Sequence, residues 1–183
     1  MARRVRPGFT IIELLIVIAI MAILLTLGVA NLGSTQVQAR DTQRSGNVQA
    51  IQAALETFWS QGNSTVPSGE YPSLMMTNDQ SVATVTSYLT DLNVKALTAP
   101  SNSSSDALVS ATNATQTTSG VQPQPSASND VYVYQPIAGD GSLCASATQV
   151  WSAKNGSGCI SYNLYYFSET KNAVQMLTSR HHQ

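Results

Sequence analysis

The chain has 183 residues, a net charge of −1 and only 10% charged side chains, whereas an average soluble domain has ~25%. Three of its nine basic residues lie in the first eight positions, so the rest of the chain carries six basic and ten acidic side chains. This acidic balance argues against general nucleic-acid binding, which depends on cationic contacts to phosphate.

An apolar stretch occupies positions 9–30. Eighteen of these 22 residues are apolar, and positions 14–25 are unbroken. As a helix the stretch would be ~33 Å long, enough to cross a bilayer core of ~30 Å. A secretory signal has a shorter apolar core with a cleavage site after it, but here Gly8 precedes the run. We therefore predict a membrane-spanning helix, with the leading arginines in the cytoplasm and the chain beyond about residue 30 outside.

Glu13 stands out in this run because an ionisable group among lipid tails costs on the order of 1–3 kcal/mol. It lies four residues after Phe9, so the two side chains share a helix face. An amine released at Phe9 can pair with Glu13 of its own chain or of a neighbouring parallel helix, and the N-terminal dipole also favours a carboxylate. We interpret Glu13 as the residue that sets the register between packed helices.

Residues 8–14, Gly-Phe-Thr-Ile-Ile-Glu-Leu, resemble the processing and assembly signature of type IV pilins and of type II secretion pseudopilins. The resemblance implies that a membrane peptidase cleaves between Gly8 and Phe9 and removes residues 1–8 as a leader. It further implies N-methylation of Phe9 and a role for Glu13 in docking subunits into a helical filament. A second set of residues is similar to the segment by which the pilin helix enters its head: Ala39, Arg40, Asp41, Arg44, Ile51, Ala54, Leu55, Phe58 and Gly69–Pro72.

The helix is expected to continue after residue 30, because no proline interrupts residues 9–61 and Gly62-Asn63 is a typical C-terminal stop. Residues 31–62 are predicted to be amphipathic and to pack on a globular head. The charges at Arg40, Asp41 and Arg44 are interpreted as a solvated helix face, where ion pairs contribute little. The apolar stripe consists of Leu32, Val37, Val48, Ile51, Leu55 and Phe58.

Residues 63–183 are assigned to the head. A loop is predicted over 64–78, followed by a short helix over 79–93 with Asn78 or Asp79 as its cap. Between Ser101 and Asp130, 18 of 30 residues are Ser, Thr, Asn or Gln. Such a composition does not build a core, so residues 98–130 are predicted to form an exposed loop.

Three strands are predicted near the C-terminus, over 131–134, 160–166 and 173–177. Cys144 and Cys159 lie between the first two, and two cysteines in a small exported domain usually form a disulfide. Asn155-Gly156 offers an alternative, because it is a strong hairpin signal that would leave Cys144 unpaired. We favour the disulfide loop over 144–159, and pilins similarly carry such a loop near the C-terminus.

No catalytic set is expected, because the two histidines, His181 and His182, lie in a polar tail. Ca²⁺ is the one ligand that the resemblance suggests, since major pseudopilins carry a Ca²⁺ site. It needs six or more oxygen ligands, and the last third of the chain offers only Asp130, Asp140 and Glu169. We therefore expect neither a metal nor another cofactor.

The sequence thus predicts an α+β, ladle-shaped prepilin, with a long N-terminal helix packed on a small antiparallel sheet. Its expected function is structural, not enzymatic: the subunit of an extracellular type IV pilus. The alternative is a pseudopilin in a short periplasmic filament that drives protein export. The expected partners are further copies of the chain, the prepilin peptidase and methyltransferase, the membrane and the pilus assembly machinery. The precursor is expected in the cytoplasmic membrane and the product in the extracellular filament.

Overall fold

The structure is a computed structural model that describes residues 8–30, 32–64, 66–77, 81–101, 108–112, 126–144 and 158–181. The chain forms two compact units, Met1–Gln38 and Ala39–Gln183, and each is described by itself. The first unit holds helix α1 (Ile11–Ala30) and the first residues of α2 (Leu32–Gln61). The predicted continuity of the helix depends on Asn31, which lies outside the described residues.

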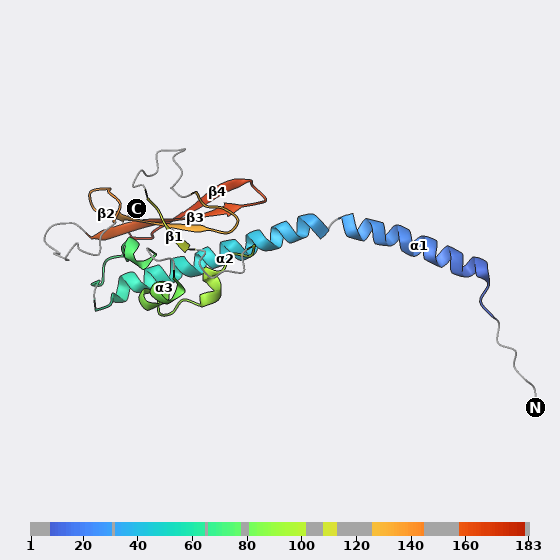
Figure 1. Ribbon diagram of the computed structural model, residues 1–183, viewed down its shortest axis with the longest axis horizontal. Coiled ribbons are helices and arrows are strands. Elements are labelled where there is room, and N and C mark those ends of the chain that lie inside the picture. Colours follow the sequence, from blue (N-terminus) through green and yellow to red (C-terminus); the bar gives the residue numbers. More distant parts are fainter. Residues whose placement is uncertain are drawn as a thin grey trace, which may run out of the picture. The chain divides into compact units, whose positions relative to one another are not determined.

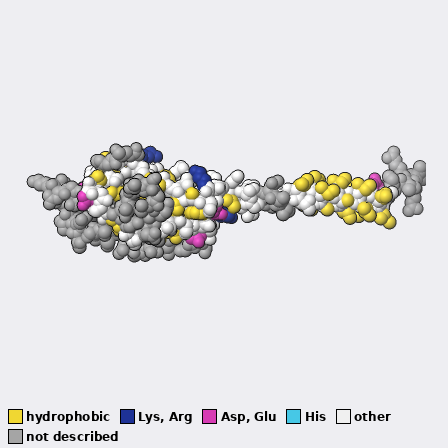
Figure 2. All heavy atoms as spheres, turned by 90° about the horizontal axis from the view of Figure 1, so that it is seen from above, with side chains coloured by type: hydrophobic (Ala, Val, Ile, Leu, Met, Phe, Trp, Pro, Cys, Tyr) yellow, Lys and Arg dark blue, Asp and Glu magenta, His cyan; other side chains and the backbone are white. Residues whose placement is uncertain are grey.

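Within the described part of the chain, Ile11–Gln61 is the one helical stretch long and apolar enough to cross a membrane. Apolar side chains cover α1, as Figure 2 shows in yellow. Their exposed fraction ranges from 43% at Val17 to 88% at Ile11. The described part of the chain thus leaves the apolar side chains of α1 exposed.

The second unit is built on a four-stranded sheet in the order β1-β2-β3-β4, with α2 on one of its faces (Figure 1). The strands are β1 (Leu108–Ser110), β2 (Tyr132–Ala138), β3 (Cys159–Ser168) and β4 (Ala173–Thr178). The last three pair antiparallel. β3 and β4 lie close to their predicted ranges, whereas β2 runs four residues beyond its predicted end.

The prediction of a purely antiparallel sheet is wrong at its first strand. β1 pairs with β2 in parallel, which makes the sheet mixed, and β1 lies inside the stretch that we expected to be a loop. Leu108 and Val109 are 2% and 7% exposed. This short apolar pair was hidden by the polar residues around it, and a three-residue strand is too short to give a periodic signal.

The core lies between α2 and the sheet. Val48, Ile51 and Leu55 of α2 are fully buried, and they belong to one cluster with tyrosines of β2 and β3. A smaller cluster, which includes Val133 and Tyr165, lies on the opposite face. The sheet is therefore covered on both faces. The strand residues that face α2 are Tyr132, Tyr134, Tyr162 and Leu164.

Short helices complete the head: η1 (Leu74–Met76), α3 (Val82–Tyr88) and η2 (Val94–Leu97). The helix predicted over 79–93 is thus present but shorter, and its cap is Ser81, whose side chain accepts a hydrogen bond from Thr84 N. The caps proposed from sequence, Asn78 and Asp79, lie outside the described residues.

The end of α2 is fixed by Gly62, whose φ is +64°. Its amide donates a hydrogen bond of 2.6 Å to Phe58 O, and an added Cβ would lie 2.6 Å from Ser68 N. Only glycine fits this left-handed, crowded position without strain. The chain is thereby turned back along the head toward the disulfide.

Candidate functional site

Thr10 and Glu13 form a capping box at the start of α1. The amide and hydroxyl of Thr10 donate to Glu13 Oε2 at 3.3 and 3.0 Å, and Glu13 N donates to Thr10 Oγ1 at 3.3 Å. The amides in the first turn of a helix have no backbone acceptor. These reciprocal hydrogen bonds satisfy the amide of Glu13, in that first turn, and the amide of Thr10, the N-cap. The role of Thr10 was not predicted from sequence, although the Thr-x-x-Glu spacing of Thr10 and Glu13 is the known signal of a capping box.

Gly8 and Phe9 precede the helix in an exposed segment without regular secondary structure. The Phe9 side chain is 79% exposed, and a Cβ added to Gly8 would have nothing within 4 Å. The fold of this chain therefore gives no steric reason for glycine at position 8.

The apolar surface of α1 is the largest exposed apolar region of the described chain. Fourteen of its sixteen exposed large hydrophobic residues lie between Phe9 and Leu27, and the other two are Val94 and Met176. Monomeric soluble proteins rarely expose contiguous apolar patches of this kind, which usually mark contact with lipid or protein.

The second unit, Ala39–Gln183, is called the head from here on. Within it, Arg44 is fully buried and forms the centre of an ion cluster. Its Nη1 lies 3.1 Å from Asp41 Oδ1 and 2.5 Å from Glu169 Oε1. Its other nitrogens donate to Ser101 Oγ at 2.7 Å and Asn129 O at 3.2 Å. The prediction of a solvated charged face is therefore wrong for Arg44, because the β3–β4 turn carries Glu169 onto this part of α2.

Asp41 holds the β3–β4 turn. It accepts hydrogen bonds from Ser168 Oγ at 2.8 Å, from the amides of Glu169 and Thr170 at 2.9 and 2.8 Å, and from Thr170 Oγ1 at 2.5 Å. Burial by itself raises the pKa of Asp41, but these hydrogen bonds outweigh it and hold the pKa well below its usual range.

Arg40 completes the cluster with a bidentate pair to Glu169, at 3.0 and 2.6 Å. Hydrogen bonds from Arg40, together with the nearby charge of Arg44, lower the pKa of Glu169 to about 2. Because both Asp41 and Glu169 titrate below their unfolded values of ~4, the cluster stabilises the head at neutral pH. That contribution is lost as the pH falls below ~4.

A second polar cluster surrounds Glu56. Its Oε1 accepts from Tyr162 OH at 2.8 Å and from Arg180 N at 3.1 Å, and its Oε2 accepts from Tyr71 OH at 2.9 Å. His181 Nε2 lies 3.4 Å from the same oxygen.

The His181 ring stacks on Trp59, with ring centroids 3.7 Å apart. Our assignment of the histidines to a polar tail is therefore wrong for His181, which packs on α2. His182 lies outside the described residues.

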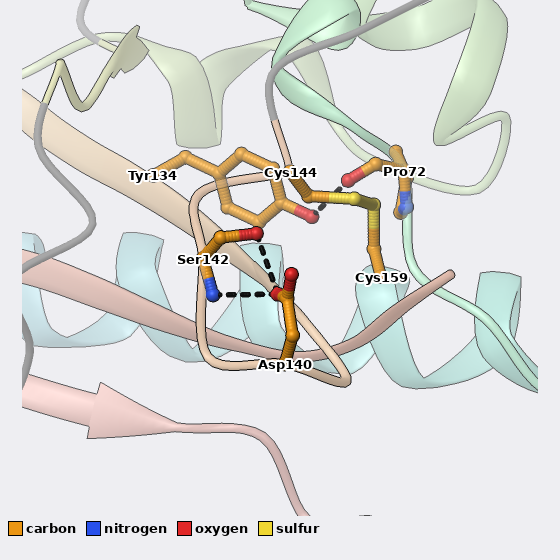
Figure 3. Close-up of a disulfide and its surroundings, with 6 residues drawn as sticks. All are labelled: Pro72, Tyr134, Asp140, Ser142, Cys144 and Cys159. Carbon is orange, nitrogen blue, oxygen red and sulfur yellow. Dashed lines mark hydrogen bonds between the residues drawn. A yellow bond between two sulfur atoms is a disulfide. The ribbon is translucent and has the colours of Figure 1, made fainter. Parts of the chain in front are cut away.

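Cys144 and Cys159 form a disulfide between the segment after β2 and the start of β3 (Figure 3). Both cysteines are buried, and Cys159 O accepts a hydrogen bond of 2.8 Å from Tyr71 N. Close to the bridge, Tyr134 OH donates to Pro72 O at 2.6 Å. The Asn155-Gly156 hairpin signal lies outside the described residues.

Among the described residues, no group of three His, Cys, Asp or Glu side chains is placed to hold a metal ion. Of the three carboxylates considered from sequence, Asp140 accepts from Ser142 N and Oγ within its own turn (Figure 3). Glu169 is paired with two arginines, and Asp130 is exposed.

Residues 3–29 match the family model described as the prokaryotic N-terminal methylation motif. The chain is also 41% identical, over 58 residues, to the type II secretion system core protein G of Pseudomonas aeruginosa. That alignment covers 32% of this chain and 41% of the relative, so the chain spans less than half the length of the relative it matches. No solved structure is significantly similar to it.

Both matches support the type IV pilin and pseudopilin family for this chain.

The matched motif of this prepilin contains Gly8, Phe9 and Glu13, and α1 with its exposed apolar surface fits a membrane-anchored precursor. The head lies beyond the matched motif. Its two polar clusters join α2 to residues that are more than 100 positions away, which is why no local sequence signal pointed to them.

Removing Arg44 should destabilise the head strongly, because Asp41 and Glu169 would keep their charges in a largely enclosed site. We expect Arg44→Ala to lower the free energy of unfolding by ~3–5 kcal/mol. Arg40→Ala is the matched control. The Arg40 side chain is 35% exposed, so its loss should cost about 1 kcal/mol or less. Urea titration of the detergent-solubilised chain measures both, and equal losses would contradict a special role for the buried arginine.

Glu70 should make the head less stable as the pH rises. Its Oε2 is buried without a hydrogen-bond partner, and burial raises its pKa to about 7. Between the unfolded pKa of ~4.3 and pH 7 the folded state then binds more protons, so stability falls as the pH increases. We expect the melting temperature to decline from pH 5 to pH 8, and Glu70→Gln to flatten this decline. Asp91→Asn, at an exposed position, is the control; an unchanged slope in Glu70→Gln would refute the assignment.

Proposed function

We propose that this prepilin is the polymerising subunit of an extracellular type IV pilus. The observation that carries the proposal is α1, whose large apolar side chains are exposed along the helix and whose first turn holds a single carboxylate. Lipid covers such a surface in the precursor. After extraction from the membrane, only the same surface of other copies offers a comparable apolar contact.

Processing supplies a cationic partner for the carboxylate of Glu13. Hydrolysis of the amide between Gly8 and Phe9 leaves a carboxylate on Gly8 and a new amine on Phe9. Methylation of that amine keeps it basic and therefore cationic at neutral pH. Thr10 contributes only dipoles to Glu13, so a cationic amine on a neighbouring Phe9 is a stronger partner for the carboxylate. Pairing across subunits then sets the register of the packed helices.

The second candidate is a pseudopilin that forms a short periplasmic filament. The similarity to a type II secretion core protein favours it. The polar stretch 98–130 and the disulfide loop favour the pilus, because both suit a long-lived outer surface. Electron microscopy of fibres sheared from cells, with mass spectrometry of their subunits, separates the two. A subunit found only in the periplasm, whose deletion blocks protein export, would establish the pseudopilin.

Gly8→Leu should prevent processing, because a peptidase that binds an extended backbone has no room for a side chain at the cut. We expect full-length protein in the membrane and no filaments. Gly33→Ala is the matched control, since an added Cβ there also meets nothing within 4 Å, and it should be cleaved normally. Intact mass spectrometry reads the N-terminus of each variant. Filaments whose subunits begin at Met1 would contradict the proposal.

Glu13→Gln should separate the charge of Glu13 from its capping role. Glutamine at this position still completes a capping box, so the start of α1 should be retained. We expect normal cleavage but at least a tenfold lower filament yield, since charge-assisted bonds contribute ~1.5–3 kcal/mol and ~1.4 kcal/mol corresponds to tenfold. Thr10→Val keeps the charge and should reduce the yield less. Parental yield in Glu13→Gln would show that capping alone matters.

A further inference from the structure

An open groove runs along the head between α2 and the β3–β4 turn, with a volume of about 430 Å³. It lies entirely within the second unit. Helix α2 lines it with Asp41, Thr42, Ser45, Gly46 and Gln49. Strand β3 contributes Tyr166 and Ser168, and the β3–β4 turn contributes Thr170 and Lys171.

The charged side chains of the helix that lines this groove are all paired with other groups of the head. Its four charged residues, Arg40, Asp41, Arg44 and Glu56, all make hydrogen bonds or ion pairs with the head. None of the exposed residues between Gly33 and Gln61 is charged. A solvated helix face normally carries charges, whereas the buried centre of a protein interface is depleted in them.

The polar groups of the groove are already paired. Both oxygens of Asp41 accept hydrogen bonds from the β3–β4 turn. Ser45 Oγ accepts from Gln49 Nε2 at 3.1 Å, and Lys171 Nζ donates to Gln175 Oε1 at 3.0 Å. Small-molecule sites present a few convergent polar groups to orient the ligand. This groove has no such unpaired polar groups among those named, so its concave surface is better suited to contact with another protein than to binding a small molecule.

Gly46 is the position where another molecule can approach α2 most closely. It is helical, exposed and free of any atom within 4 Å of an added Cβ. Glycine inside a helix costs ~1 kcal/mol relative to alanine. The fold of the single chain therefore gains nothing from glycine at position 46, whereas a neighbour packed against α2 gains contact with the backbone.

We propose that this groove is a docking surface for a second copy of the chain, with Gly46 at the point of closest approach. The inference rests on the proposed function, because a filament places many copies side by side. In the sequence, no charged residue occurs between Leu14 and Ala39, so an uncharged stretch leads directly into the part of α2 that lines the groove.

Gly46→Leu should separate folding from assembly. In the monomer the added Cβ meets no other atom within 4 Å and leucine has the higher helix propensity, so the melting temperature of the head should stay equal or rise. In the filament it fills the groove, and we expect at least a tenfold lower yield. Ala83→Leu, at an exposed position of α3 outside the groove, is the matched control and should assemble as the parent does. Parental yield in Gly46→Leu would overturn the inference.

Gly46→Cys adds one thiol to a chain whose described cysteines are bonded to each other. Its rate of labelling by a maleimide is measured in detergent-solubilised monomer, in membranes and in sheared filaments. Docking predicts fast labelling in the first two and at least tenfold slower labelling in filaments. Equal rates in monomer and filament would overturn docking, and protection already in membranes would assign the surface to lipid or to another protein. Failure of the parent to form filaments would instead overturn the proposed function.

Discussion

The head depends on the burial of Arg44 within α2. A guanidinium removed from water costs several kcal/mol unless its charge and its donors are satisfied. Here Asp41 and Glu169 supply the charge, and Ser101 and Asn129 supply further acceptors. These partners come from α2, the β3–β4 turn and two separate loop segments. Only one docking of the helix on the sheet brings them together, so the pairing requirement selects that arrangement.

The cluster around Glu56 acts at the other end of the same helix. Between the two clusters, Val48, Ile51 and Leu55 pack on the sheet, but apolar contacts alone are non-directional and tolerate a shift along the helix axis. Hydrogen bonds at both ends remove that freedom. The pairing of the α2 charges with the head has a second consequence. None of the exposed residues of α2 between Gly33 and Gln61 is charged.

Local patterns were sufficient for much of the fold. The apolar run predicted α1, and the three- and four-residue spacing predicted the packed face of α2. β-branched and aromatic residues predicted β2, alternation predicted β3, and a weaker strand signal predicted β4. The rest depends on partners distant in sequence. From its local sequence, Arg44 is predicted to be a surface charge. Its burial depends on the ion pair with Glu169 in the β3–β4 turn, which lies 125 residues further along the chain. β1 and the stacking of His181 on Trp59 depend in the same way on chain segments that no local period connects.

Glu13 and Arg44 follow one electrostatic rule with different outcomes. Each is a charge that belongs in an environment of low polarity, and each needs an opposite charge nearby. Arg44 has two carboxylates within its own head. Glu13 has the amide and hydroxyl of Thr10, which lower the cost of its charge without neutralising it. The charge of Arg44 is therefore balanced within the monomer, whereas, on the proposed function, the charge of Glu13 is balanced only when processing and assembly supply a cation.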